Sequence, residues 1–85
     1  MKAVTIYTKS FCPFCHRAKD LLRAKQATFD EISVDGDPDS QRQMAARANG
    51  RSTVPQVFIG DLHVGGCDDL YALENAGKLD ALLAA

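Results

Sequence analysis

The hydrophobic pattern changes its period within the first 25 residues of the chain. Residues 3–8 alternate in character, with Val4 and Ile6 on one face, and this two-residue period predicts a β-strand. From Pro13 the apolar residues recur at helical spacing, which predicts a helix to about Lys25. Its predicted inward face holds Cys15, Ala18 and Leu22 with Leu21 beside them, and its predicted water-facing side chains are Arg17, Lys19, Asp20 and Arg23.

A second apolar segment, Phe29 to Val34, completes a strand–helix–strand unit, for which a right-handed parallel crossover is expected. The following Asp35-Gly36-Asp37-Pro38 predicts a turn in which Asp37 caps a helix that begins at Pro38. This second helix carries Met44, Ala45 and Ala48 as its apolar residues and stops at Gly50.

Two further apolar segments, residues 54–59 and 62–64, are joined by Gly60-Asp61 and predict a β-hairpin. A third helix opens at Asp68 and Asp69, and Gly77 separates it from a last helical segment; the apolar residues of this region are Leu70, Tyr71, Leu73, Ala76, Leu79, Leu82 and Leu83. The order βαβαββα predicts an α/β fold in which helices flank a mixed four-stranded sheet. We expect a single domain over residues 1–85.

The composition is that of an ordinary soluble globular domain, with 46% hydrophobic and 25% charged residues. The formal net charge of -1 gives no long-range attraction to nucleic acid or to anionic lipid, so neither partner is expected. No apolar segment approaches the ~20 residues that span a bilayer. The start of the chain lacks a signal-peptide pattern, so we expect a cytoplasmic location. We also expect a monomer.

Three cysteines are too few for a secreted disulfide framework, and in a reducing compartment they indicate metal binding or redox catalysis. Cys12-Pro13-Phe14-Cys15 lies where the first strand gives way to the first helix. At a helix N-terminus, free N–H groups and the helix dipole lower a thiol pKa from ~8.5 to ~3.5–7.5. Cys12 is therefore the expected nucleophile, and Cys15, one turn later and facing the core, is the expected resolving thiol.

Two residues beside this pair are candidates for ligand binding. Lys9 precedes the motif and either stabilises the thiolate, holds a ligand carboxylate or is simply solvated. Phe14, between the cysteines, is expected to form an exposed apolar wall that shields a mixed disulfide.

A zinc site formed by Cys12, Cys15, His63 and Cys67 is the competing interpretation. Zinc modules separate their ligand pairs by ~12–20 residues, whereas here two helices and two strands lie between them. We therefore expect no metal, with His63 as a strand residue and His16 facing solvent.

Two later motifs are ambiguous on local grounds alone. Thr53-Val54-Pro55 suggests a trans proline at the start of a strand, since only ~5–6% of X-Pro bonds are cis. Gly65-Gly66-Cys67-Asp68-Asp69 suggests either a turn and an acidic helix start, or a close backbone approach with N–H groups free for a carboxylate.

Together, Cys12–Cys15, Thr53–Pro55 and Gly65–Asp69 resemble the glutaredoxin family over the full length of the chain. The resemblance implies a thioredoxin fold, a cis Pro55 beside the disulfide and a glutathione groove. In that groove the tripeptide's cysteine would pair with the Val54 backbone, and its γ-glutamyl end would meet Cys67 and Asp68. The full set of implied glutathione-binding residues is Lys9, Phe14, Arg42, Thr53, Val54, Pro55, Gly66, Cys67 and Asp68, with Lys9 and Arg42 at the glycyl carboxylate.

The resemblance also implies an enzyme, a glutathione-dependent disulfide oxidoreductase that needs no bound cofactor and uses glutathione as reducing co-substrate. Its expected substrates are protein disulfides and glutathionylated proteins, ribonucleotide reductase being one possibility. Two alternatives stay open: a glutathione-ligated iron–sulfur cluster carrier, and a thioredoxin-like protein with a flavoprotein reductase. Pro13 and the second cysteine argue against the first, and the Gly65–Asp69 segment against the second. Phe14 stands where tyrosine is frequent, a change that keeps the ring.

Overall fold

The computed structural model describes residues 2–84, and its elements follow the predicted βαβαββα order, with α4 as the additional helical segment. The elements are β1 (Val4–Thr8), α1 (Pro13–Ala24), β2 (Phe29–Ser33), α2 (Pro38–Arg47), β3 (Gln56–Ile59), β4 (Leu62–Gly65), α3 (Cys67–Asn75) and α4 (Leu79–Ala84). No helix within residues 2–84 is long and apolar enough to cross a membrane.

Several predicted boundaries differ from the observed ones by a few residues, and two of these differences lie at the loops described below. Strand β3 begins at Gln56 instead of Val54, because Pro55 has no N–H to donate to a strand ladder. Helix α3 begins at Cys67 instead of Asp68, with Gly66 as its N-cap residue. The predicted start of α2 is confirmed, since the Asp37 carboxylate accepts the Ser40 amide at 3.1 Å.

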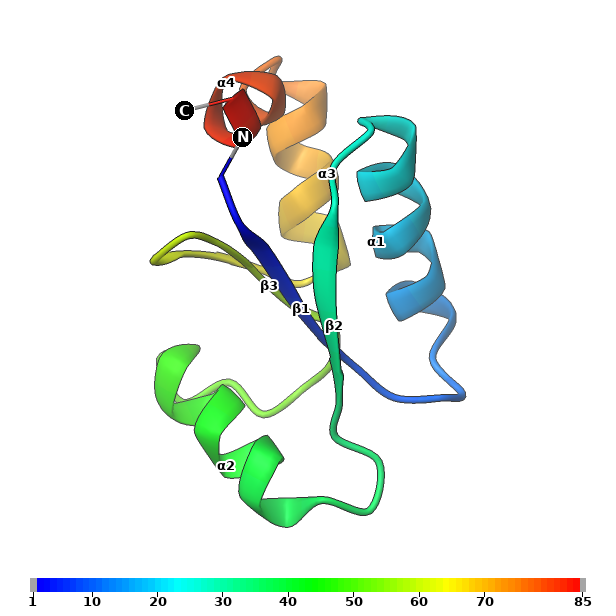
Figure 1. The fold of residues 1–85 in the computed structure, drawn as a ribbon, viewed down its shortest axis with the longest axis vertical. Helices are drawn as coiled ribbons and strands as arrows, with labels where there is room; N and C mark the ends of the chain where they lie inside the picture. Colours follow the sequence, from blue (N-terminus) through cyan, green and yellow to red (C-terminus); the bar gives the residue numbers. More distant parts are fainter. Residues whose placement is uncertain (1, 85) are drawn as a thin grey trace.

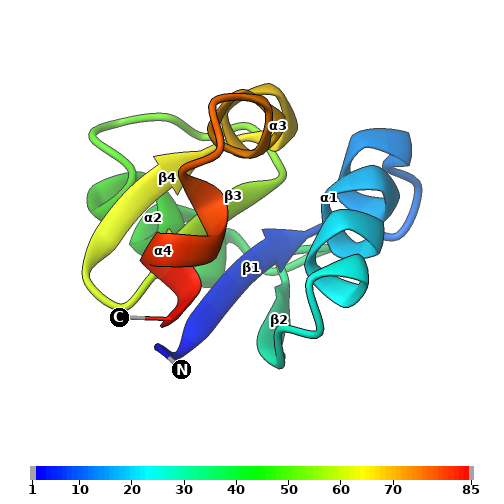
Figure 2. The same ribbon diagram turned by 90° about the horizontal axis from the view of Figure 1, so that it is seen from above.

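The four strands form the predicted mixed sheet in the order β2-β1-β3-β4. Figure 2, seen from above, shows β1 lying between β2 and β3. Strands β1 and β2 are parallel, as a helix-containing crossover requires, whereas β1–β3 and β3–β4 are antiparallel. Strands β3 and β4 thus form the hairpin that was predicted from the Gly60-Asp61 turn.

Two apolar clusters lie on opposite faces of the sheet, because side chains along a strand point alternately to one face and the other. Ile6 and Ile59 belong to the cluster under α1, α3 and α4, whereas Tyr7 and Phe58 belong to the cluster under α2. Figure 1 shows α1 and α3 together on one side of the strands and α2 apart from them. Strands β1 and β3 therefore each contribute to both layers of the core, since successive residues point to opposite faces.

The prediction that Lys19 faces water is wrong. Its side chain is buried on α1, and its Nζ lies 3.0 Å from Glu31 Oε2, which also accepts the Thr8 hydroxyl at 2.7 Å. The Thr8 hydrogen bond, and after it the Lys19 contact, lower the pKa of Glu31 against the opposing effect of burial. Helical spacing alone does not reveal this burial, because the partner carboxylate lies on a neighbouring strand.

The strand directions bring three loops to one edge of the sheet. Strand β3 runs antiparallel to both β1 and β4, so the end of β1, the start of β3 and the end of β4 lie at the same edge. The Cys12–Cys15 motif follows β1, Pro55 precedes β3 and Gly66-Cys67 follows β4. The three predicted motifs therefore meet, although they are far apart in the sequence.

Candidate active site

Cys12 and Cys15 form a disulfide at the N-terminus of α1, with their Cα atoms 5.2 Å apart. Cys12 is the N-cap residue and Pro13 occupies the first turn, as predicted. The Cys15 amide donates a hydrogen bond to Cys12 Sγ at 3.1 Å. Cys12 is 9% exposed and Cys15 is 0% exposed, so only the first sulfur is open to attack from solvent.

The Val54–Pro55 peptide bond is cis. The trans proline expected from local frequencies is therefore wrong, and the cis proline implied by the resemblance is confirmed. Frequencies of isolated X-Pro bonds carry no information about the tertiary surroundings that select one isomer. The Val54 carbonyl oxygen lies 3.9 Å from Cys12 Sγ, so this loop stands directly beside the redox pair.

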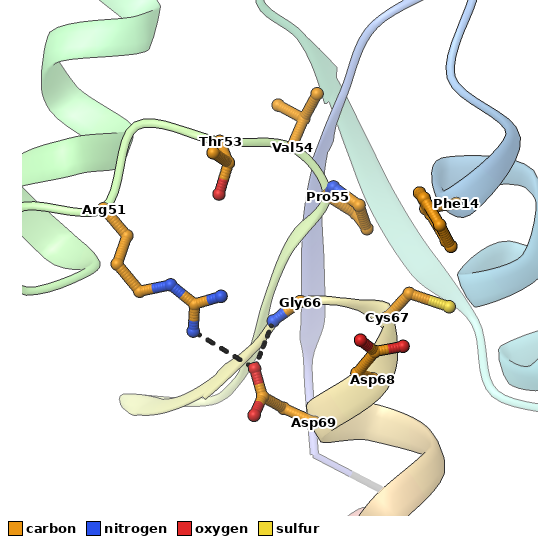
Figure 3. A pocket seen from close by; sticks show the side chains of 9 residues that line it. All are labelled: Phe14, Arg51, Thr53, Val54, Pro55, Gly66, Cys67, Asp68 and Asp69. Atoms are coloured by element: carbon orange, nitrogen blue, oxygen red, sulfur yellow. Dashed lines mark hydrogen bonds and ion pairs between the residues drawn. The ribbon is translucent and has the colours of Figure 1, made fainter.

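A groove of about 150 Å³ opens next to the cysteines. Figure 3 shows its walls, which are the loop before β3, the start of α3 and the Phe14 ring. Its lining residues are Phe14, Arg51, Thr53, Val54, Pro55, Gly66, Cys67, Asp68 and Asp69. All the predicted glutathione-binding residues except Lys9 and Arg42 are among them.

Phe14 has the predicted position of an exposed apolar wall. It is 52% exposed, and the Arg17 guanidinium lies 5.9 Å from the centre of its ring. The same guanidinium lies 5.6 Å from the ring centre of Tyr71 on α3. Arg17 thereby links the Phe14 wall to α3, in a cation–π geometry.

Lys9 and Arg42 lie outside the groove. Arg42 forms an ion pair with Asp39 on the exposed side of α2 and borders a separate depression with Gln41 and Ser52. Lys9, in the loop after β1, acts electrostatically on Asp35. Their predicted contact with a glycyl carboxylate therefore stays a prediction, which requires a ligand that extends beyond the groove.

Two groove residues, Arg51 and Asp69, were not among the predicted binding residues. Arg51 Nη1 lies 3.1 Å from Asp69 Oδ2, and that oxygen also accepts the Gly66 amide at 2.9 Å (Figure 3). The Gly66 hydrogen bond and then the Arg51 hydrogen bond lower the pKa of Asp69. Asp69 is an acidic residue in the first turn of a helix, so the sequence indicates a capping role for it. No local sequence pattern indicates that Arg51 belongs to the groove.

Cys67 and Asp68 are the first two residues of α3. Their N–H groups belong to the first turn, where no carbonyl of the helix can accept them. Cys67 is 4% exposed, and burial raises the pKa of its thiol, which holds the sulfur in its protonated form at neutral pH. The carboxylate of Asp68 is exposed at the groove (Figure 3).

The four ligands of the alternative zinc site do not come together. His63 lies on β4, and its Nε2 is 2.7 Å from Gln56 Oε1 while its ring packs against Phe58. Burial lowers the pKa of His63. Among residues 2–84 no group of three histidine, cysteine or acidic side chains is arranged to hold a metal ion.

Comparison with known proteins agrees with this geometry. The sequence profile of the Glutaredoxin family matches residues 4–64. A glutaredoxin from Pseudomonas aeruginosa is 58% identical over 85 residues, which is 100% of both chains.

Solved structures give the same result for the fold. The solution structure of a glutaredoxin from Brucella melitensis has a TM-score of 0.85 at 57% identity and covers 98% of this chain and 89% of its own. A buckwheat glutaredoxin–glutathione complex has a TM-score of 0.84 at 35% identity, over 95% of this chain and 76% of its own. These matches confirm the predicted thioredoxin fold. The chain therefore belongs to the glutaredoxin family of thiol–disulfide oxidoreductases, in which glutathione serves as the co-substrate.

Proposed function

We propose that Cys12 is the nucleophile and Cys15 the resolving thiol in a cycle that reduces protein disulfides and glutathione mixed disulfides. The observation that carries this assignment is the hydrogen bond from the Cys15 amide to Cys12 Sγ at the start of α1. A donor aimed at the sulfur stabilises the charged form of the thiol more than the neutral one. The helix dipole acts in the same direction.

For a protein disulfide the cycle has four thiol–disulfide exchanges. The Cys12 thiolate attacks one substrate sulfur, so a Cys12–substrate bond forms, the substrate disulfide breaks and its other sulfur leaves as a thiolate. Cys15 then attacks Cys12 Sγ, which releases the second substrate thiol and leaves the Cys12–Cys15 disulfide. A glutathione thiolate then attacks Cys12 Sγ, so a Cys12–glutathione bond forms and Cys15 leaves as a thiol. A second glutathione attacks the sulfur of the bound glutathione, which frees Cys12 and gives glutathione disulfide. The cycle requires no bound cofactor.

We place glutathione in the groove beside the redox pair, and the solved complex of the buckwheat relative with glutathione supports this placement. The tripeptide's cysteine lies along Val54, where its main chain adds a short strand. The γ-glutamyl carboxylate meets the free amides at the start of α3, and the α-ammonium meets the Asp68 carboxylate. Thr53, Pro55 and Gly66 supply backbone surface, and Phe14 covers the mixed disulfide. Lys9 and Arg42 hold the glycyl carboxylate.

The protein partners in this proposal are disulfide-forming or glutathionylated proteins, with ribonucleotide reductase as one candidate. Cys67 is a free, buried thiol that is not paired with either redox cysteine, as is usual in compartments where thiols are kept reduced. We also propose that residues 1–85 act as one domain and as a cytoplasmic monomer.

A coupled assay tests the reaction and the donor together. Purified protein is supplied with glutathione, glutathione reductase, NADPH and hydroxyethyl disulfide, which forms a mixed disulfide with glutathione. Turnover that saturates with glutathione is the expected result. Turnover that requires a flavoprotein thioredoxin reductase and ignores glutathione would replace this proposal with the thioredoxin-like alternative.

A further inference from the structure

Phe11, in the loop between β1 and α1, is 100% exposed, the most exposed of the large apolar side chains in residues 2–84. A single exposed apolar residue is common on protein surfaces and by itself means little. Phe11 differs because it directly precedes the nucleophile, so that the Cα atoms of Phe11 and Cys12 are about 3.8 Å apart. The glutathione groove does not include it.

The segment that presents Phe11 is tied to the rest of the molecule. The Ser10 amide donates to Asp35 Oδ2 at 2.7 Å, and the Ser10 hydroxyl donates to the same oxygen. These bonds connect the loop to the turn after β2. The aromatic ring is therefore carried by a fixed backbone, which reduces the ordering that a binding partner would have to impose.

The chemistry of Cys12 defines what approaches this ring. In a mixed disulfide the substrate cysteine and Cys12 have Cα atoms only ~5.5–6 Å apart. A residue next to the substrate cysteine can then come within reach of the fully exposed Phe11 side chain. Phe11 is not among the residues that line the groove proposed for glutathione, so its ring stays free for the polypeptide.

We propose that Phe11 is a docking contact for polypeptide substrates and selects those with an apolar side chain next to the reactive cysteine. This inference rests on the proposed cycle through Cys12. Aromatic residues are enriched at protein interfaces because they bury a large area with few rotatable bonds. Phe11 thus distinguishes protein disulfides from glutathione mixed disulfides, which use the groove alone.

The test compares two peptides, each with one internal disulfide. In the first, leucine precedes each of the two cysteines; in the second, serine takes the place of both leucines. For the native protein, kcat/KM for the leucine peptide should exceed kcat/KM for the serine peptide by roughly three- to tenfold. This ratio corresponds to partial burial of the Phe11 ring against one leucine side chain. Phe11→Ser should bring this ratio close to one. Its kcat/KM for the glutathione–hydroxyethyl mixed disulfide should stay at the native value.

Leu62→Ser is the matched control, since Leu62 is also an exposed apolar residue, at 47%, but lies on β4 outside the site. It should keep the native ratio. A native ratio near one, or a preference for leucine that survives in Phe11→Ser, would overturn the docking role. If the native protein fails on the small mixed disulfide as well, the proposed function fails and the docking role falls with it.

A trapped complex gives a second measurement that does not depend on rates. A Cys15→Ser protein joined through Cys12 to a version of the leucine peptide that keeps only one cysteine has no thiol left to resolve the mixed disulfide. Nuclear Overhauser contacts between the Phe11 ring and the leucine methyl groups are expected in it. Their absence would contradict the docking role.

Discussion

Arg51 Nη1 lies 3.1 Å from Asp69 Oδ2, the same carboxylate oxygen that accepts the Gly66 amide hydrogen bond. This contact joins the loop that leads to Pro55 with the first turn of α3. Those two segments are the walls of the proposed glutathione groove (Figure 3). The pair therefore connects the two walls within the groove lining and leaves the Asp68 carboxylate free.

Asp69→Asn should lower stability in a way that depends on pH. The Gly66 amide and Arg51 lower the pKa of Asp69 below its ordinary value of 3.8. The ionised carboxylate is therefore stabilised in the folded state relative to the unfolded state. Stability from this group is present above pH ~4 and is lost as pH falls through the folded pKa. At pH 7 the variant should be less stable by roughly 0.5–1 kcal/mol, because asparagine can still accept the Gly66 amide but loses the charge that pairs with the half-exposed Arg51.

Denaturant unfolding at pH 7 and at several values below 4 measures this effect. The difference between the native protein and Asp69→Asn should shrink toward zero in acid. Asp20→Asn, on the exposed side of α1, is the control and should show a small difference at all pH values. A large deficit for Asp69→Asn that is constant with pH would assign the loss to packing.

Gly65→Ala should destabilise the protein more than Gly36→Ala. Both glycines have positive φ, +117° and +62°, which a side chain disfavours. A Cβ at Gly65 would also stand 2.8 Å from Asp69 Cγ and 2.9 Å from Arg51 Nη1, whereas nothing lies within 4 Å of one at Gly36. We expect a loss of about 1 kcal/mol at Gly36 and about 1–3 kcal/mol more at Gly65, measured as free energy of unfolding. Equal losses would show that the Arg51–Asp69 pair moves aside freely.

Local patterns predict the elements of this fold and the redox pair because each is specified by neighbouring residues. The period change at Pro13 and the cap at Asp37 are of this kind, and so is the position of Cys12 at a helix start. The pairing of Arg51 with Asp69 and the burial of Lys19 against Glu31 are different. They join segments that meet only after the sheet has formed, so no helical or strand period records them.

The cis bond before Pro55 is an intermediate case, since local patterns did not predict it but the family resemblance did. Its local surroundings predicted trans, and only the resemblance of three separate motifs to one family implied the observed cis bond. Lys9 and Arg42 were transferred from the same resemblance. Arg42 pairs with Asp39, and the contact of both residues with a glycyl carboxylate stays a prediction.

Cys67→Ser should change glutathione turnover only slightly. In the proposed site Cys67 contributes its backbone N–H, and burial raises the pKa of its thiol, so the sulfur is a poor nucleophile at neutral pH. Replacing a buried small thiol by a hydroxyl should cost modest stability. Steady-state kinetics and thermal unfolding of the variant separate the two effects. A large loss of activity at unchanged melting temperature would make Cys67 a third redox centre.

Cys12→Ser and Cys15→Ser should have unequal effects. The nucleophile is needed in every cycle, so Cys12→Ser should abolish turnover of all substrates. The resolving thiol is needed only when a protein substrate remains attached, so Cys15→Ser should keep turnover of small glutathione mixed disulfides and lose most reduction of protein disulfides. Parallel assays with hydroxyethyl disulfide and a disulfide-bonded protein measure both activities. Equal losses in the two variants would contradict the assigned roles.

Asp68→Asn separates a ligand-binding role for the carboxylate from a helix-capping role. As a residue of the first turn of α3, Asp68 contributes a dipole interaction of only ~0.3–1 kcal/mol, so the melting temperature should change little. As the partner of the glutathione α-ammonium, its carboxylate accepts a charge-assisted hydrogen bond worth ~1.5–3 kcal/mol. The glutathione concentration for half-maximal rate should therefore rise roughly tenfold or more, because ~1.4 kcal/mol corresponds to a factor of ten.

Asp80→Asn is the matched control for this measurement, since Asp80 is the second residue of α4 and lies outside the groove. It should leave the glutathione dependence unchanged, although it removes an ion pair to Lys25. A well-folded Asp68→Asn protein with native glutathione kinetics would reduce Asp68 to a helix-start residue. The γ-glutamyl end of glutathione would then have to be held by the amides at the start of α3 alone.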